Sequence, residues 1–112
     1  MPTYTSIRAA DADESLSIAG TAVTLTLPAY FTATAAGGVN HGRVVITINS
    51  GGPMLFTTNG TAPTDSGDTT GERVNIGDTL YVTTLQEMRD LKMIRATGAT
   101  AVGFARYEAR TA

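Results

Sequence analysis

Hydrophobic and polar positions alternate in short runs along much of the chain, a pattern typical of strands with one buried face. The first run lies in residues 16–27, where Val23, Leu25 and Leu27 alternate with threonines. Pro28 ends this run, because proline cannot donate a hydrogen bond to a strand ladder. These residues predict the first clear strand, with its valine and leucine side chains buried.

The strongest strand signal lies at Arg43–Asn49, where apolar side chains occupy both faces. One face holds Val44, Ile46 and Ile48, and the other holds Val45 and Thr47. A strand that is apolar on both sides is expected in the middle of a sheet. Ser50–Pro53 contains a Gly-Gly pair and Met54–Thr58 resumes a strand pattern, which together predict a hairpin.

Shorter elements are expected in the second half of the chain. Residues 72–82 predict two strands, the first extending to Ile76 and the second following a turn at Gly77–Asp78. Met93 and Ile94 predict a further short strand. Between these strands the polarity pattern changes from a period of two to a period of three.

That change marks the one helical segment we expect. Leu85, Met88 and Leu91 recur every three residues, with polar side chains between them. This spacing suits one or two helical turns that rest an apolar edge on the strands.

Ala101–Tyr107 predicts a closing strand with Val102 and Phe104 turned inward. Short strands at hairpin spacing, separated by glycine turns, predict an all-β fold. We expect an antiparallel β-sandwich, jelly-roll-like, with at most one short helical segment near 85–91. The whole of 1–112 is expected to form one domain, with 1–15 as a possible N-terminal arm or edge segment.

Composition excludes several classes of protein. The formal net charge is −2 and lysine and arginine occur as spaced single residues, which argues against a nucleic-acid partner. No apolar run approaches the roughly 20 residues that cross a bilayer, so no membrane partner is expected. The absence of cysteine excludes disulfides, thiolate zinc sites and cysteine nucleophiles. No basic and then apolar leader is visible, so synthesis in a cytoplasm is expected.

Candidate chemistry is sparse. His41 is the only histidine and lies among loop residues, without a second group to make it a general base or metal ligand. Two acidic clusters carry the oxygen ligands that Ca²⁺ prefers: Asp11, Asp13 and Glu14, and the pair Asp65 and Asp68. Neither has the ligand spacing of a calcium loop, and turn hydrogen bonding explains Asp65 and Asp68 more simply. We therefore expect no metal, no cofactor and no enzyme activity.

Four tyrosines leave a carbohydrate site open as an alternative, because an exposed aromatic ring can stack on a sugar. They are Tyr4, Tyr30, Tyr81 and Tyr107. Their scattered placement on strands favours a half-buried core or interface position for most of them.

Four segments occur in an order that points to a known family. They are a Thr-x-Val-x-Leu strand at Thr21–Leu25, a strand with a Gly-Thr-Ala-Pro-Thr turn at Met54–Thr64, a Gly-Asp turn before a strand at Val74–Leu80, and an Ile-Arg-Ala-Thr-Gly-Ala-Thr segment within Leu91–Val102. In these features the chain resembles the small β-sandwich virion proteins of tailed bacteriophages. It departs from them before the first turn, where they often carry an aromatic residue or arginine and this chain has two threonines.

The resemblance implies a virion structural protein, made in the host cytoplasm and located on the outer capsid surface. Such a decoration or cement protein binds the major capsid protein, associates with copies of itself and stabilises the shell. The alternative is a tail- or fibre-associated module that recognises host carbohydrate. The interface candidates lie in the N-terminal arm and in loops: Tyr4, Ile7, Arg8, Tyr30, Phe31, His41, Arg43, Pro63, Asp65 and Asp68.

Overall fold

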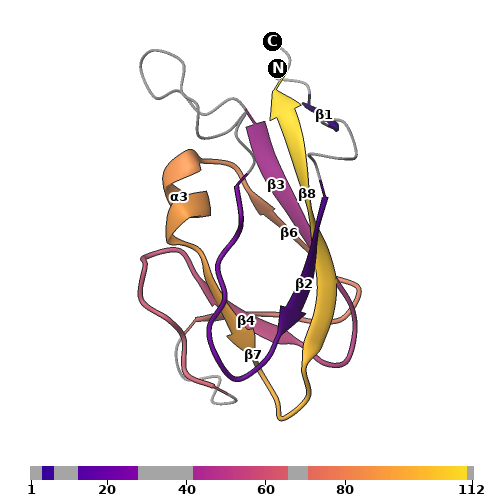
Figure 1. Cartoon of the computed structure of the whole chain (residues 1–112), viewed down its shortest axis with the longest axis vertical. Helices are drawn as coiled ribbons and strands as arrows, with labels where there is room; N and C mark the ends of the chain where they lie inside the picture. The colour runs from indigo at the N-terminus through magenta and orange to yellow at the C-terminus, as the bar shows by residue number, and fades with distance from the viewer. Residues whose placement is uncertain (1–3, 7–12, 28–41, 66–70, 111–112) are drawn as a thin grey trace.

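The computed structural model describes residues 4–6, 13–27, 42–65 and 71–110. These residues form two antiparallel sheets and one short helix, α3 (Leu85–Asp90) (Figure 1). The larger sheet contains β1 (Tyr4–Ser6), β2 (Asp13–Ile18), β3 (Gly42–Ser50), β6 (Thr79–Val82) and β8 (Ala101–Arg110). The smaller sheet contains β4 (Met54–Thr57), β5 (Glu72–Val74) and β7 (Lys92–Arg95). The predicted all-β antiparallel sandwich with one short helix is confirmed.

Strand β8 organises the five-stranded sheet. It pairs with β3 on one side, and with β1 and β2, one after the other, on its opposite side. β3 in turn pairs with both β8 and β6, so its predicted position in the middle of a sheet is confirmed. The segment expected as an arm or edge contributes two edge strands, with Tyr4 opposite Arg110 and Glu14 opposite Ala105.

Strand β4 lies in the middle of the three-stranded sheet. Met54 faces Val74 of β5 on one side and Arg95 of β7 on the other. Beyond β7, Val23 forms an isolated bridge with Met93 through two backbone hydrogen bonds of 2.9 and 3.0 Å. The segment around Val23 therefore lies beside the smaller sheet.

The strand predicted within residues 16–27 is only partly correct. The ordered strand ends at Ile18, and the remainder makes the single bridge at Val23. The Thr26 amide donates instead to the Glu14 carboxylate at 2.9 Å, which takes this backbone group out of any ladder. The predicted burial is confirmed in part: Leu25 is buried, Val23 and Leu27 are only partly buried against the core, and Thr24 and Thr26 are exposed.

The predicted hairpin between β3 and β4 is wrong, because the two strands belong to different sheets. Both edges of β3 are already paired, so no edge is free to accept β4. The connection leaves the first sheet at Gly51, whose φ of 87° lies in the left-handed region. A side chain there would also overlap the carbonyl oxygen of Thr100, so only glycine fits this crossing.

A second crossing joins β5 to β6. Asn75 and Asp78 close a turn in which the Asp78 amide donates to the Asn75 carbonyl at 3.0 Å. Ile76 was predicted to belong to the first of the two strands in residues 72–82, which is β5. It lies instead within this turn and is half exposed, while Gly77 supplies a φ of 90°. The turn carries the chain from the smaller sheet to the edge of the larger one.

The inward face predicted for β8 is also wrong. Val102 is 42% exposed, and Phe104 is only partly buried. The buried positions are the alternate ones, Ala101, Gly103, Ala105 and Tyr107. A side chain at Gly103 would overlap the carbonyl oxygen of Thr47, so the inner face of β8 here tolerates no larger residue.

The core fills the space between the sheets and extends to α3. Met88 and Leu91, two of the three predicted apolar helix positions, are 1% and 0% exposed. The strands contribute the remaining members, chiefly Leu16, Ile18, Val44, Ile46, Ile48, Met54, Phe56, Val74, Val82, Met93 and Tyr107. The helix therefore closes the core as its periodicity predicted.

Candidate functional site

A pocket of about 580 Å³ lies where the two sheets meet α3. Residues 56–59, Gly71 and Glu72 line it from β4, β5 and their connection. Residues 80–82 of β6 line it from the other sheet, and Glu87 lines it from α3. Its volume falls within the roughly 300–1,000 Å³ range of small-ligand sites.

The floor of the pocket is apolar. Val82 and Leu80 pair with the buried Val44 and Ile46, so they share the core-facing side of their sheet. Phe56, 9% exposed, approaches from the opposite sheet and also belongs to the core. The pocket is thus an open end of the core, with hydrophobic surface at its base.

The mouth of the pocket carries two carboxylates. Glu72 lies opposite Phe56 in the β4–β5 register, two residues before the buried Val74. Because side chains alternate along a strand, Glu72 faces the same side as Val74, toward the pocket. The described part of the chain offers its carboxylate no hydrogen-bond or ion-pair partner.

The second carboxylate, that of Glu87, is held in place by the start of α3. Thr84 is the N-cap, and its hydroxyl accepts from the Glu87 amide at 3.2 Å. The same hydroxyl donates to Glu87 Oε1 at 3.0 Å. These bonds resemble a capping box and leave Glu87 Oε2 available as an acceptor.

Tyr81 on the edge strand β6 is among the residues that line the pocket, but it alternates with the core-facing Leu80 and Val82, so its ring lies on the outer face of the sheet and is 55% exposed. The guanidinium carbon of Arg43 lies 4.9 Å from the centroid of its ring, a cation–π distance. Arg43 Nε also donates to Glu108 Oε1 at 2.6 Å. Arg43, an interface candidate, is therefore engaged with Tyr81 and Glu108 on the outer face of the larger sheet.

The other interface candidates do not gather into one site. Pro63 is buried. Asp65 accepts two hydrogen bonds from Arg95, at 2.8 and 3.2 Å, and this contact raises the pKa of Arg95. Tyr4 belongs to β1. The remaining candidates lie outside the described residues: Ile7, Arg8, Tyr30, Phe31, His41 and Asp68. None of the four candidates that the structure describes, Tyr4, Arg43, Pro63 and Asp65, is among the residues that line the pocket.

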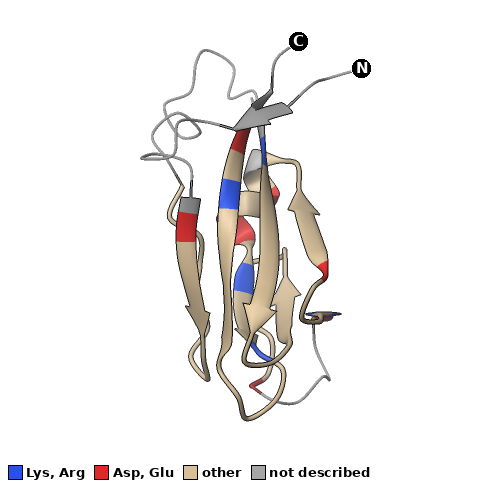
Figure 2. Ribbon diagram, turned by 90° about the vertical axis from the view of Figure 1, so that its right-hand side faces the viewer, with Lys and Arg blue, Asp and Glu red and all other residues tan. Residues whose placement is uncertain are grey.

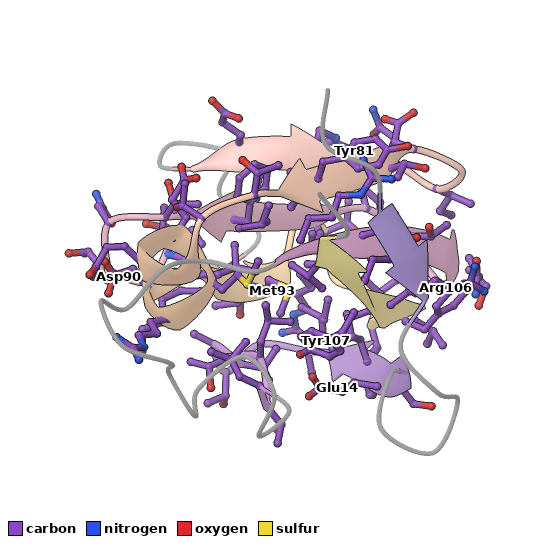
Figure 3. All side chains as sticks on the ribbon, turned by 90° about the horizontal axis from the view of Figure 1, so that it is seen from above. Glu14, Tyr81, Asp90, Met93, Arg106 and Tyr107 are labelled. Carbon is purple, nitrogen blue, oxygen red and sulfur yellow. The ribbon has the colours of Figure 1, made fainter. Side chains whose placement is uncertain are left out.

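Tyr107 is one of the four tyrosines that left a carbohydrate site open. Its side chain is 1% exposed, so its ring cannot stack on a sugar at the surface. Burial, together with its hydrogen bond to Glu14, raises the pKa of its hydroxyl. In Figure 3 Glu14 and Tyr107 lie close together, whereas Arg106 points away from the core. Of the two tyrosines whose side chains the structure describes, only Tyr81 exposes its ring.

Charge elsewhere is dispersed. Acidic and basic residues are interspersed along the described strands rather than gathered on one face (Figure 2). Within the described ranges, no three histidine or acidic side chains converge as metal ligands do. The helix that the structure describes is too short and too polar to cross a bilayer.

No family model matches the chain, and neither a curated protein nor a solved structure gives a match. Function is therefore inferred from the residues and the fold. Sequence reasoning missed Glu72 and Glu87, although the Thr84-x-x-Glu87 spacing is a recognisable capping signal. Nothing in the sequence places that signal beside Glu72.

Proposed function

We propose that the protein is a virion structural protein of a tailed bacteriophage, a decoration protein that binds the outer surface of the major capsid protein. Many copies, each adding a modest interface, would shift the shell toward its assembled state. Association between neighbouring copies adds to this effect on a symmetric surface.

The observation that supports this proposal is the position of the four segments that carry the resemblance. Met54, from the Met54–Thr64 segment, pairs with Val74 of the Val74–Leu80 segment and with Arg95 of the Leu91–Val102 segment. Val23, from the Thr21–Leu25 segment, forms a bridge with Met93 of the Leu91–Val102 segment. A part of each of the four segments therefore lies in or directly beside the smaller sheet. Such convergence is expected when a resemblance reflects one shared structural unit.

The proposal is tested by sedimentation with capsids. Expanded shells are assembled from the major capsid protein of the genome that encodes this chain, without any decoration protein. The purified protein is added in increasing amounts, and the shells are pelleted. We expect saturable co-sedimentation at a fixed number of copies per shell. Recovery of the protein in the supernatant alone, at every concentration, would refute a capsid role.

A second candidate function is carbohydrate recognition on a tail or fibre. It is favoured by the half-exposed ring of Tyr81 on the outer face of the larger sheet, where a sugar could stack on it. A glycan array separates the two functions. Specific binding that Tyr81→Ala abolishes would support carbohydrate recognition, whereas an array without binding together with capsid co-sedimentation would exclude it.

A further inference from the structure

The pocket combines two kinds of surface that together select a ligand class. At its base, Phe56, Leu80 and Val82 offer a small area of apolar contact, since Phe56 and Val82 are 9% and 3% exposed. Its mouth holds the carboxylates of Glu72 and Glu87, which accept hydrogen bonds and cannot donate when ionised. A ligand that satisfies both must carry a donor group at the end of an apolar stem.

The charge of the residues that line the pocket narrows the class of ligand further. Among the described residues that line the pocket, two are glutamates and none is a lysine or arginine. An anionic ligand would be repelled, and a neutral ligand would gain hydrogen bonds without a Coulomb contribution. A cationic ligand gains both the hydrogen bonds and the Coulomb attraction, and charge-assisted hydrogen bonds are roughly twice as strong as neutral ones.

We propose that this pocket binds a lysine or arginine side chain presented by a partner protein. The aliphatic stem covers Phe56 and Leu80, and the cationic head binds Glu72 and Glu87. Both side chains have this amphipathic form, with an apolar stem and a charged tip. The volume of about 580 Å³ leaves room for part of the partner chain that carries the side chain.

The two carboxylates are held by different elements of the fold. Thr84 fixes one oxygen of Glu87 at the start of α3, and strand pairing with Phe56 fixes the backbone of Glu72. A site held before binding loses less conformational freedom when its ligand arrives. In the setting of the proposed function, on which this identification of the partner rests, the basic side chain belongs to the major capsid protein.

The first test uses the purified protein and a small probe. Backbone amide resonances are followed by NMR while N-acetyl-arginine methylamide is added, and separately its neutral isostere N-acetyl-citrulline methylamide or a neutral disaccharide. We expect the arginine probe alone to shift resonances of residues around Glu72 and Glu87. Equal shifts with the citrulline probe, shifts only with the sugar, or no shifts with any probe would overturn the inference.

Matched variants make the assignment specific. Glu72→Gln and Glu87→Gln should each weaken arginine binding about tenfold, because each removes one charge-assisted bond. Glutamine retains the capping function at position 87, so the helix is preserved. Asp90→Asn, on the same helix and outside the pocket, removes the same charge and should leave binding unchanged. An equal loss with all three variants would indicate a general charge effect and contradict the site.

A capsid experiment separates this inference from the function on which it rests. If the wild type co-sediments with shells and the Glu72→Gln/Glu87→Gln double variant does so equally well, the pocket is not the docking site and the decoration role stands. If the arginine probe binds the pocket but the wild-type protein does not co-sediment with shells, the decoration role is refuted and the binding site is supported. We expect the double variant to bind shells at least about tenfold more weakly than the wild type.

Discussion

The hydroxyl of Tyr107 donates a hydrogen bond of 2.7 Å to Glu14 Oε1, and the same oxygen accepts the amide of Thr26 at 2.9 Å. One carboxylate oxygen thus joins β2, β8 and the segment that follows β2. The Tyr107 side chain is 1% exposed. This contact fixes the edge of the larger sheet against the polypeptide that continues toward the smaller one.

Removing that hydroxyl should destabilise the fold. Tyr107→Phe keeps the ring in the core and deletes the donor, so we expect a loss of about 2 kcal/mol in the free energy of unfolding. Tyr81→Phe is the matched control, since its ring is half exposed, and it should change stability by less than about 0.5 kcal/mol. Urea denaturation measures both. Equal effects of the two substitutions would show that the Tyr107–Glu14 bond contributes nothing particular.

Stability should also depend on alkaline pH through Tyr107. Burial, and then the hydrogen bond to Glu14, raise the pKa of this hydroxyl above its ordinary value of 10.0. The folded state therefore keeps the proton at a pH where the unfolded chain has lost it. This contribution is complete below pH 10 and is lost as the pH rises above it, because ionisation then favours the unfolded chain.

Denaturation curves collected on either side of pH 10 test this dependence. The free energy of unfolding of the wild type should fall with pH more steeply than that of Tyr107→Phe. Parallel pH profiles for the two proteins would contradict the assignment of the slope to Tyr107.

Gly103 should be among the least replaceable residues of β8. An added methyl group would overlap the Thr47 carbonyl oxygen and lie 2.9 Å from Ile48 Cα, so the backbone of β3 must move. We expect Gly103→Ala to cost about 3 kcal/mol or more. At Gly98 no atom lies within 4 Å of the added carbon, so Gly98→Ala should be nearly neutral. Thermal melting of both variants measures the difference, and similar melting temperatures would refute the close approach.

The N-cap of α3 should affect both stability and the pocket. Thr84→Ala removes the acceptor for the Glu87 amide and the donor to its carboxylate, at a cost of about 1 kcal/mol. Thr84→Ser retains both bonds and should restore most of that stability. The same pair should rank in the same order in binding the arginine probe. If alanine and serine behave alike in urea denaturation, the cap is not formed in solution.

Elements whose evidence lies within their own residues could be predicted from the sequence. β3 carries apolar residues on both faces, which predicted a position in the middle of a sheet, and the structure places it between β6 and β8. Met88 and Leu91 repeat at helical spacing, and both are buried. In each case the local pattern and the final packing demand the same side-chain placement.

The wrong predictions concern features that depend on residues distant in the sequence. The Gly51-Gly52 pair suggested a hairpin, but the two edges of β3 are taken by β6 and β8. Hydrophobicity favoured Val102 and Phe104 as the inner face of β8, but the inner positions are Ala101, Gly103, Ala105 and Tyr107, and the approach of the Thr47 carbonyl oxygen leaves room only for glycine at position 103. The pocket was beyond prediction for the same reason, because Glu72 and Glu87 line one pocket only once the two sheets and α3 are assembled.

The heat resistance of decorated shells tests the proposed role most directly. Expanded capsids without decoration protein are heated with and without the purified protein, and shell disruption is followed by calorimetry. A decoration protein that binds only the assembled shell must raise the disruption temperature with added protein until its sites are filled. We predict a saturable rise with the wild type and a smaller rise, at equal concentration, with the Glu72→Gln/Glu87→Gln variant. An unchanged disruption temperature at saturating wild-type protein would contradict the proposed function.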